Sequence, residues 1–230
     1  MNKIFTIGLL FSVVLISAVL GVISSDKSTQ GDTDATAREA QTAAITIIAF
    51  GDSLTAGYGV QLSEAYPAQL ERALLERGYD VRVINSGVSG ETTRGNVERA
   101  SFIRSQAADI VILGTGGNDA LRSLSVEKTK ENISTTLNLL LESEQVPRVL
   151  LLKMQAPLNS GREYKQNFDS LYQELADTRN IVLVPFLTEA IFLDERNKLP
   201  DGIHYNEQGY QKVIQTHILP AVIDVLEGRV

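Results

Sequence analysis

The sequence of 230 residues has no cysteine and no tryptophan, and it contains only two histidines. Without cysteine there is no disulfide, no thiol nucleophile and no thiolate metal ligand, and no lipid can be attached to a cysteine near the N-terminus. A histidine-rich metal site is disfavoured because His204 and His217 are the only two histidines. They are also the only histidine candidates for a general base, and His217 lies within a predicted helix, where we expect a structural or surface role.

Positive charge is also scarce. The 21 lysines and arginines are outnumbered by 28 acidic residues, which gives a net charge of −7, and no basic cluster occurs anywhere. This balance argues against a nucleic-acid partner. The hydrophobic share of 43% and the charged share of 21% are typical of a globular protein, and the length suits one well-buried domain and a tail.

The one long apolar run lies near the N-terminus. Residues 4–23 carry no charge and follow Lys3, so they have the length of a membrane-spanning helix or can serve as a secretory signal. We expect residues 1–25 to be a signal peptide or a membrane anchor, and the polar residues 26–43 to be a flexible linker. Positive charge before the run places the remainder outside the cytoplasm. The predicted location is therefore periplasmic, either secreted or anchored in the inner membrane.

From residue 44 onward, short apolar runs alternate with longer amphipathic stretches, which predicts one α/β domain over residues 44–230 with a parallel sheet covered by helices on both faces. The predicted strands cover residues 45–50, 81–85, 110–113, 149–154 and 181–184. The predicted helices cover residues 66–76, 92–104, 126–142, 162–177 and 207–226. Asn206 is a plausible cap for the last helix, and Pro220 should kink or split it.

Ser53 follows the first predicted strand. Residues 47–50 are a continuous apolar run, as in a strand inside a parallel sheet, and Gly-Asp-Ser-Leu follows at 51–54. Ligands of such sheets bind beyond the carboxyl ends of the strands. A serine that opens a helix there combines an exposed hydroxyl with a free backbone N–H, as a nucleophile beside an oxyanion site requires. The alternative is an ordinary strand followed by an Asp/Ser cap.

Three further polar segments lie beside predicted elements. Gly90 precedes the second predicted helix, where its backbone N–H can point at an oxyanion, and Asn118 offers an amide on a glycine-rich loop after the third strand. Asp201 and His204 stand three residues apart ahead of the last helix, where the carboxylate can hold the imidazole tautomer. Each segment alone is equally explained as a turn, a cap or a hydrogen-bonded loop.

Together and in this order, the four segments resemble the SGNH (GDSL) hydrolase family. Gly-Asp-Ser-Leu matches its nucleophile block, Gly90 its glycine block, and Asn118 within Gly-Gly-Asn-Asp its Gly-x-Asn-Asp block. Asp201 and His204 match its Asp-x-x-His block. The resemblance extends from about residue 44 to the C-terminus. Residues 53–59 are further similar to the bacterial acyl-CoA thioesterase, lysophospholipase and arylesterase branch, although Tyr205 stands where that branch often has proline.

The resemblance implies a three-layer α/β/α, flavodoxin-like fold around a five-stranded parallel sheet, and acyl transfer to water. In that chemistry His204, oriented by Asp201, deprotonates Ser53, which attacks the carbonyl of an ester or thioester. The oxyanion hole comprises the backbone N–H groups of Ser53 and Gly90 and the side chain of Asn118. No metal and no organic cofactor is expected.

The substrate is predicted less narrowly. By analogy with the family, Leu121, Leu124 and Leu158 border an acyl pocket, although apolar loop residues often simply pack. The expected partner is a small-molecule or lipid acyl ester, such as an acyl thioester, a lysophospholipid or an aryl ester, with possible membrane contact through the N-terminal segment. A deacetylase of a cell-wall or exported polysaccharide is the alternative enzyme, and a non-catalytic binding module is the alternative class.

Overall fold

The computed structural model describes residues 44–142, 145–179 and 181–230. The apolar run and the polar linker predicted for residues 1–43 lie outside the described residues, so the signal or anchor, the linker and the domain boundaries stay predictions. In the three described ranges, no helix is both long enough and apolar enough to span a bilayer.

The strands of the described residues form one five-stranded parallel sheet in the order β2-β1-β3-β4-β5. Each strand lies within two residues of its predicted position, and their bounds are β1 (Ile45–Gly51), β2 (Val81–Gly87), β3 (Ile110–Gly114), β4 (Arg148–Lys153) and β5 (Val182–Pro185). The fold predicted from the alternating pattern is therefore confirmed.

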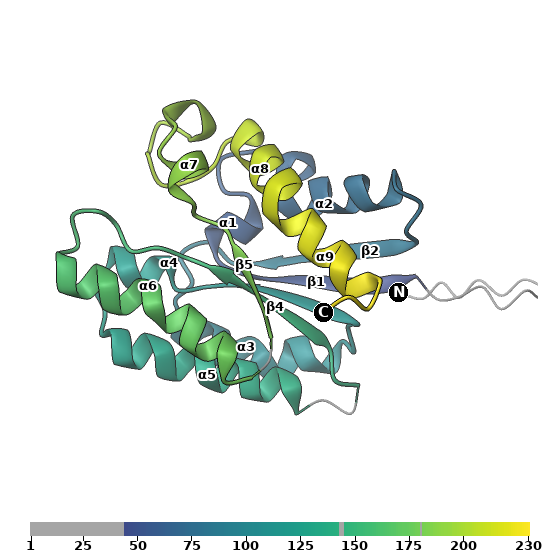
Figure 1. Ribbon diagram of the computed structural model, residues 1–230, viewed down its shortest axis with the longest axis horizontal. Coiled ribbons are helices and arrows are strands. Elements are labelled where there is room, and N and C mark those ends of the chain that lie inside the picture. Colours follow the sequence, from purple (N-terminus) through teal and green to yellow (C-terminus); the bar gives the residue numbers. More distant parts are fainter. Residues whose placement is uncertain (1–43, 143–144, 180) are drawn as a thin grey trace, which may run out of the picture. The chain divides into compact units, whose positions relative to one another are not determined.

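Helices cover both faces of this sheet (Figure 1). On one face lie α2 (Tyr66–Leu75), α8 (Glu207–Val213) and α9 (Leu219–Leu226). On the other lie α3 (Thr93–Ser105), α5 (Val126–Leu141) and α6 (Arg162–Asp177). The periodicity did not predict the short helical turns, which are α1 (Ser53–Ala56), η1 (Leu62–Glu64), α4 (Gly117–Leu121), α7 (Glu189–Phe192) and η2 (Glu195–Asn197).

The central strands are apolar without alternation because both of their faces are covered. Ile47, Ile48, Ala49 and Phe50 of β1 have no exposed surface. The helices instead bury one stripe each, as in α6, which buries Phe168 and four other side chains at helical spacing. β1 is thus an interior strand of the sheet with core side chains packed on both of its faces.

The structure divides the last predicted helix into three consecutive helical segments, which agrees with the expectation that Pro220 kinks or splits it. Asn206 does cap α8, since its side chain accepts the Gly209 N–H at 3.0 Å. The helix then widens into a π-helical turn over Ile214–Ile218 (η3) before α9 begins. Pro220 is the second residue of α9, where it has no N–H to donate and its ring crowds the preceding turn. The break therefore falls ahead of the proline, because the wider π turn accommodates the missing bond.

The strand order also determines where a ligand can bind. β2 pairs with one edge of β1, and β3 pairs with its other edge. The chain therefore adds its second strand on one side of β1 and its later strands on the opposite side. Such a reversal opens a crevice at the carboxyl ends of the strands. Gly51, Gly87 and Gly114 end β1, β2 and β3 in register with one another, and the four polar segments singled out in the sequence gather at this edge.

Candidate active site

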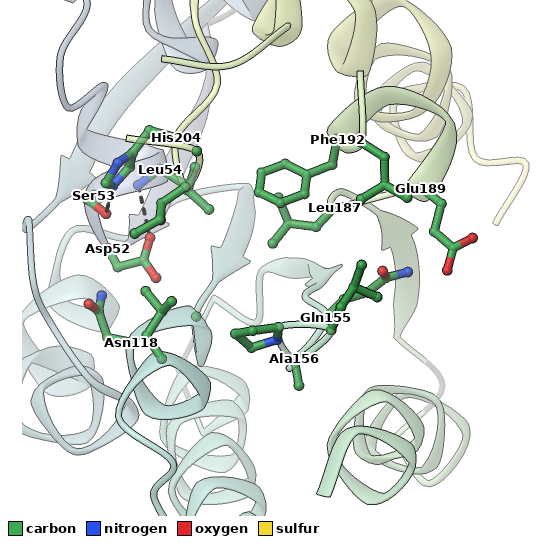
Figure 2. A pocket seen from close by; sticks show the side chains of 17 residues that line it. Asp52, Ser53, Leu54, Asn118, Gln155, Ala156, Leu187, Glu189, Phe192 and His204 are labelled. Atoms are coloured by element: carbon green, nitrogen blue, oxygen red, sulfur yellow. Dashed lines mark hydrogen bonds between the residues drawn. The ribbon is translucent and has the colours of Figure 1, made fainter. Parts of the chain in front are cut away.

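A serine, a histidine and an aspartate form one hydrogen-bonded chain at this edge of the sheet. Ser53 opens α1, and its Oγ lies 2.8 Å from Nε2 of His204 (Figure 2). Nδ1 of the same ring lies 2.7 Å from Oδ2 of Asp201. With the carboxylate accepting from Nδ1–H, Nε2 is the ring nitrogen that faces the serine hydroxyl. This is the arrangement of a nucleophile, a general base and an orienting carboxylate.

Asp201 is held in its ionised form. Burial works against its charge, but the backbone N–H of Ile203 at 2.9 Å, the His204 ring and the backbone N–H of His204 at 3.1 Å together keep the pKa of Asp201 below its usual value. A carboxylate that accepts three hydrogen bonds from its own loop is fixed in direction. It can therefore hold the imidazole in one orientation throughout a reaction.

Tyr58 covers one side of this histidine. Its ring centroid lies 4.6 Å from that of His204, with the planes tilted by 37°. The tyrosine is 52% exposed, so the imidazole is shielded on that side by a ring that itself faces solvent. The sequence does not predict this contact, because Tyr58 and His204 are far apart in the chain.

Asp52, the residue before the serine, organises the first turn of α1. Its Oδ1 accepts the Leu54 N–H at 3.0 Å, and its carbonyl accepts the N–H groups of Thr55 and Ala56 at 3.1 and 2.9 Å. The Ser53 N–H is the first-turn amide that none of these acceptors engages, so it can serve a ligand. Burial, followed by the nearby carboxylate of Glu91, raises the pKa of Asp52 to about 7.

The two other expected oxyanion donors follow β2 and β3, with Gly90 in the turn after β2 and Asn118 in the short helix α4 after β3. Gly90 has φ +81°, a left-handed backbone conformation that is strained for residues with a side chain. Its carbonyl accepts a hydrogen bond from the Arg122 guanidinium at 3.0 Å. Asn118 donates one Nδ2 hydrogen to the carbonyl of Glu91 at 2.9 Å. An amide nitrogen carries two hydrogens, so the second is left for a substrate oxygen.

An apolar pocket of about 160 Å³ opens beside the serine. In Figure 2, Ser53, His204 and Asn118 lie on one side of it, and Leu187 and Phe192 lie on the other. Most of the remaining lining is also apolar, namely Leu54, Leu121, Ala156, Pro157, Leu158, Leu193 and Ile203. Such a pocket suits a hydrocarbon chain whose carbonyl reaches the serine.

Two of the three leucines predicted for the acyl pocket line it, and one does not. Leu121 and Leu158 line the pocket, but Leu124 is not among its lining residues and instead lies before α5, where its carbonyl accepts the Tyr164 hydroxyl at 2.9 Å. Sequence reasoning missed Leu187 and Phe192. The position of Leu187 just after the fifth strand, at the edge where the other site residues gather, was the available signal.

Two further expectations concern groups outside this site. His217 lies in the π-helical turn, is not among the pocket residues, and has its pKa lowered by burial. In the part of the chain that the structure describes, no cluster of three or more His, Asp and Glu side chains could hold a metal ion. The absence of a cofactor stays a prediction.

Known proteins are similar to this chain in both sequence and fold. The GDSL-like lipase/acylhydrolase family matches residues 49–212. An arylesterase of Vibrio mimicus is 33% identical over 159 residues, which are 69% of this chain and 78% of that protein. The thioesterase 1/protease 1/lysophospholipase L1 of Escherichia coli (strain K12) is 32% identical over 165 residues, which are 71% and 77% of the two chains.

A solved structure of a known esterase has the same fold. The crystal structure of AlinE4, a SGNH-hydrolase family esterase, superposes with a TM-score of 0.65 at 38% identity, over 80% of this chain and 97% of that one. The chain therefore belongs to the GDSL-like lipase/acylhydrolase family, also called the SGNH hydrolases. It is a serine hydrolase that acts on ester bonds.

Proposed function

We propose that this enzyme cleaves medium-chain or long-chain acyl esters and thioesters, with the acyl chain in the pocket beside Ser53. The observation that carries this proposal is the apolar lining, which reaches from Leu54 next to the nucleophile to Phe192 on the opposite wall. Burial of apolar surface contributes about 25 cal/mol per Å², or about 0.8 kcal/mol per methylene group. Each methylene that the pocket covers therefore favours a longer acyl chain over acetyl.

The proposed reaction has two steps. His204 Nε2 takes the proton of Ser53 as the serine oxygen attacks the acyl carbonyl, and the same ring then protonates the leaving alcohol or thiol. Water attacks the resulting acyl-serine, its proton passes to His204, and the acid leaves as Ser53 regains its proton. The N–H groups of Ser53 and Gly90 and the Asn118 amide hold the oxyanion in both steps.

We also propose that the domain acts outside the cytoplasm. The uncharged run at residues 4–23 after Lys3 supports export or an inner-membrane anchor. Cell fractionation of the full chain, with protease added to intact spheroplasts, tests this location. Digestion of the domain in spheroplasts or its release with the periplasm is expected, whereas a protected protein in the cytoplasm contradicts the proposal.

The test of the substrate class is a series of nitrophenyl esters from two to sixteen carbons. We expect Ser53-dependent hydrolysis that peaks beyond acetyl. Removing the phenyl ring in Phe192→Ala should lower kcat/KM for octanoate relative to acetate by about 10-fold, because about 1–3 kcal/mol of apolar contact is lost. Phe102→Ala is the matched control, since Phe102 is 65% exposed and is not a pocket residue.

Other outcomes point elsewhere. Serine-dependent activity confined to acetyl esters would favour a carbohydrate deacetylase. An equal loss on acetate and octanoate in Phe192→Ala would mean that the acyl chain does not occupy this pocket.

A further inference from the structure

An ion pair lies behind the proposed oxyanion site. Nε and Nη2 of Arg99, on α3, lie 2.7 and 2.5 Å from the two carboxylate oxygens of Glu91. The Glu91 side chain is only 8% exposed and that of Arg99 26%. Neither residue lines the pocket. The pair is therefore bidentate and largely shielded from water, and any part it plays in catalysis is exerted through other groups.

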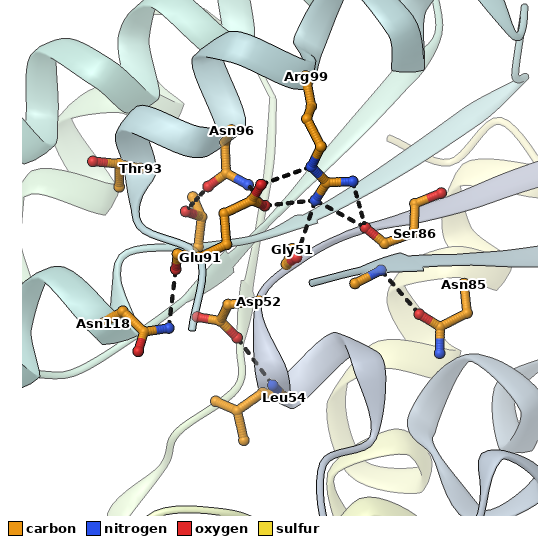
Figure 3. A network of polar contacts seen from close by, with 12 residues as sticks. Gly51, Asp52, Leu54, Asn85, Ser86, Glu91, Thr93, Asn96, Arg99 and Asn118 are labelled. Carbon is orange, nitrogen blue, oxygen red and sulfur yellow. Dashed lines mark hydrogen bonds and ion pairs between the residues drawn. The ribbon is translucent and has the colours of Figure 1, made fainter. Parts of the chain in front are cut away.

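The guanidinium of Arg99 also binds the ends of two strands (Figure 3). Nη1 and Nη2 each lie 3.1 Å from the carbonyl oxygen of Ser86 in β2, and Nη2 lies 3.4 Å from that of Gly51, the last residue of β1. Gly51 stands two residues before Ser53, and Ser86 stands four before Gly90. One planar group thus ties together the two strand ends that lead to the first two oxyanion donors.

Glu91 extends the same network to the third donor. Its carbonyl accepts the Asn118 amide at 2.9 Å, and its carboxylate accepts the Asn96 amide at 2.6 Å. The Asn96 side-chain oxygen in turn accepts the hydroxyl of Thr115, the first residue after β3. The backbone next to Ser53 and Gly90 and the side chain of Asn118 are therefore all bound within one connected set of hydrogen bonds.

A glycine in α3 makes room for this arrangement. A Cβ on Gly95 would lie 2.6 Å from Cγ of Glu91 and 3.0 Å from its Oε1. Glycine inside a helix costs about 1 kcal/mol relative to alanine. Its presence at this position is explained by the close approach of the Glu91 side chain to the helix.

The geometry points to the Arg99–Glu91 pair as a positioning device that fixes the three oxyanion donors relative to one another. This inference rests on the proposed acyl transfer. Oxyanion donors are effective when their directions are set before the reaction, so that no reorganisation is needed as charge develops. The planar fork of arginine sets directions that a lysine ammonium does not. Replacing the Arg99 guanidinium should therefore lower kcat and leave KM unchanged.

The experiment compares Arg99→Lys, Glu91→Gln and Gly95→Ala with wild type in the full-length protein. For each we measure kcat and KM on nitrophenyl octanoate, the inhibition constant of an octyl trifluoromethyl ketone, and thermal unfolding. The ketone adds to Ser53 and carries an oxyanion, so its affinity reports the donors directly. Arg94→Lys is the matched control, because Arg94 forms an exposed pair with Glu98 on the same helix.

Arg99→Lys should lower kcat about 10- to 100-fold, change KM by less than about twofold and weaken the ketone in proportion to kcat. Gly95→Ala, which keeps both charges, should change the same quantities in the same direction. If Arg99→Lys or Glu91→Gln fails to fold, the kinetics of Gly95→Ala alone test the inference. They are then measured at a temperature well below the thermal unfolding midpoint of that variant.

Three results would overturn the inference while wild type remains active. These are kcat values equal to that of Arg94→Lys, a kcat loss without weaker ketone binding, and a rise in KM that matches the fall in kcat. Wild type without Ser53-dependent hydrolysis would instead refute the proposed function on which the inference rests.

Discussion

Replacing Asp52 with asparagine should remove a loss of stability that develops as the pH rises from about 4 to about 7. Asp52 is 1% exposed, and burial together with the Glu91 and Asp119 charges raises its pKa from 3.8 to about 7. In that pH window the unfolded chain has this carboxyl ionised, whereas the folded protein keeps it protonated. The folded state therefore binds more protons, and its stability falls as the pH rises.

The size of this effect follows from the difference in pKa. The folded and unfolded values differ by about 3 pH units, and each unit corresponds to about 1.4 kcal/mol. Asp52 should therefore lower the free energy of unfolding by up to about 4 kcal/mol at pH 8 relative to pH 4. An asparagine keeps a side-chain oxygen that can accept the Leu54 N–H, so the cap of α1 can persist without the charge.

The assay is urea denaturation of wild type and Asp52→Asn at unit steps between pH 4 and pH 8. The difference between the two proteins removes the contribution of titrating groups that do not interact with Asp52. It should change in favour of the asparagine variant as the pH rises to about 7, and stay constant above that. A difference that is independent of pH, or that changes in favour of wild type, would refute the assignment of a raised pKa to Asp52.

Asp194→Asn is a control of opposite sign. Hydrogen bonds from Arg196 lower the pKa of Asp194 to about 2, so its contribution is present above about pH 4 and is lost only below that. The stability difference between this variant and wild type should be constant from about pH 5 to pH 8.

Three further predictions concern single side chains. Asn118→Ala should lower kcat about 10²–10³-fold with the fold intact, measured on nitrophenyl octanoate; near-normal turnover would remove Asn118 from the oxyanion site. Asp201→Asn should lower kcat about 10²–10⁴-fold because the His204 ring loses its orienting carboxylate, and unchanged turnover would contradict that role. Tyr205→Phe should cost about 1 kcal/mol in urea denaturation, since the buried hydroxyl donates to the Phe186 carbonyl at 2.7 Å; an unchanged midpoint would show that this bond contributes nothing.

The sequence predicts the sheet well because β1, β3 and β4 are short runs of apolar residues, as strands covered on both faces need to be. It predicts Ser53, His204 and Asp201 as a group because the four polar segments occur in the same order as the motifs of the SGNH hydrolase family. Its hydrophobic periodicity does not show α1 or α4, since a helix of four or five residues is too short for a period of 3.6, and a helix opening at Ser53 was suggested only by the Gly-Asp-Ser segment.

The far wall of the pocket was harder to predict. Phe192 belongs to a short helix 139 positions after Ser53, and only the three-dimensional fold brings the two to one cavity. Tyr205 stands where the related branch often has proline. It is fully buried, and its ring packs edge-on against Phe192 at a centroid distance of 5.5 Å. It therefore supports the pocket wall from behind, which no local pattern reveals.

The most direct test of the account is covalent labelling by a fluorophosphonate, followed by peptide mapping. An activated serine displaces fluoride and keeps the phosphonyl group, whereas an ordinary surface serine does not react. We expect one adduct, on Ser53, which is absent in Ser53→Ala and forms far more slowly in His204→Gln. No adduct, or an adduct on another serine that persists in Ser53→Ala, would contradict the assignment of Ser53 as the nucleophile.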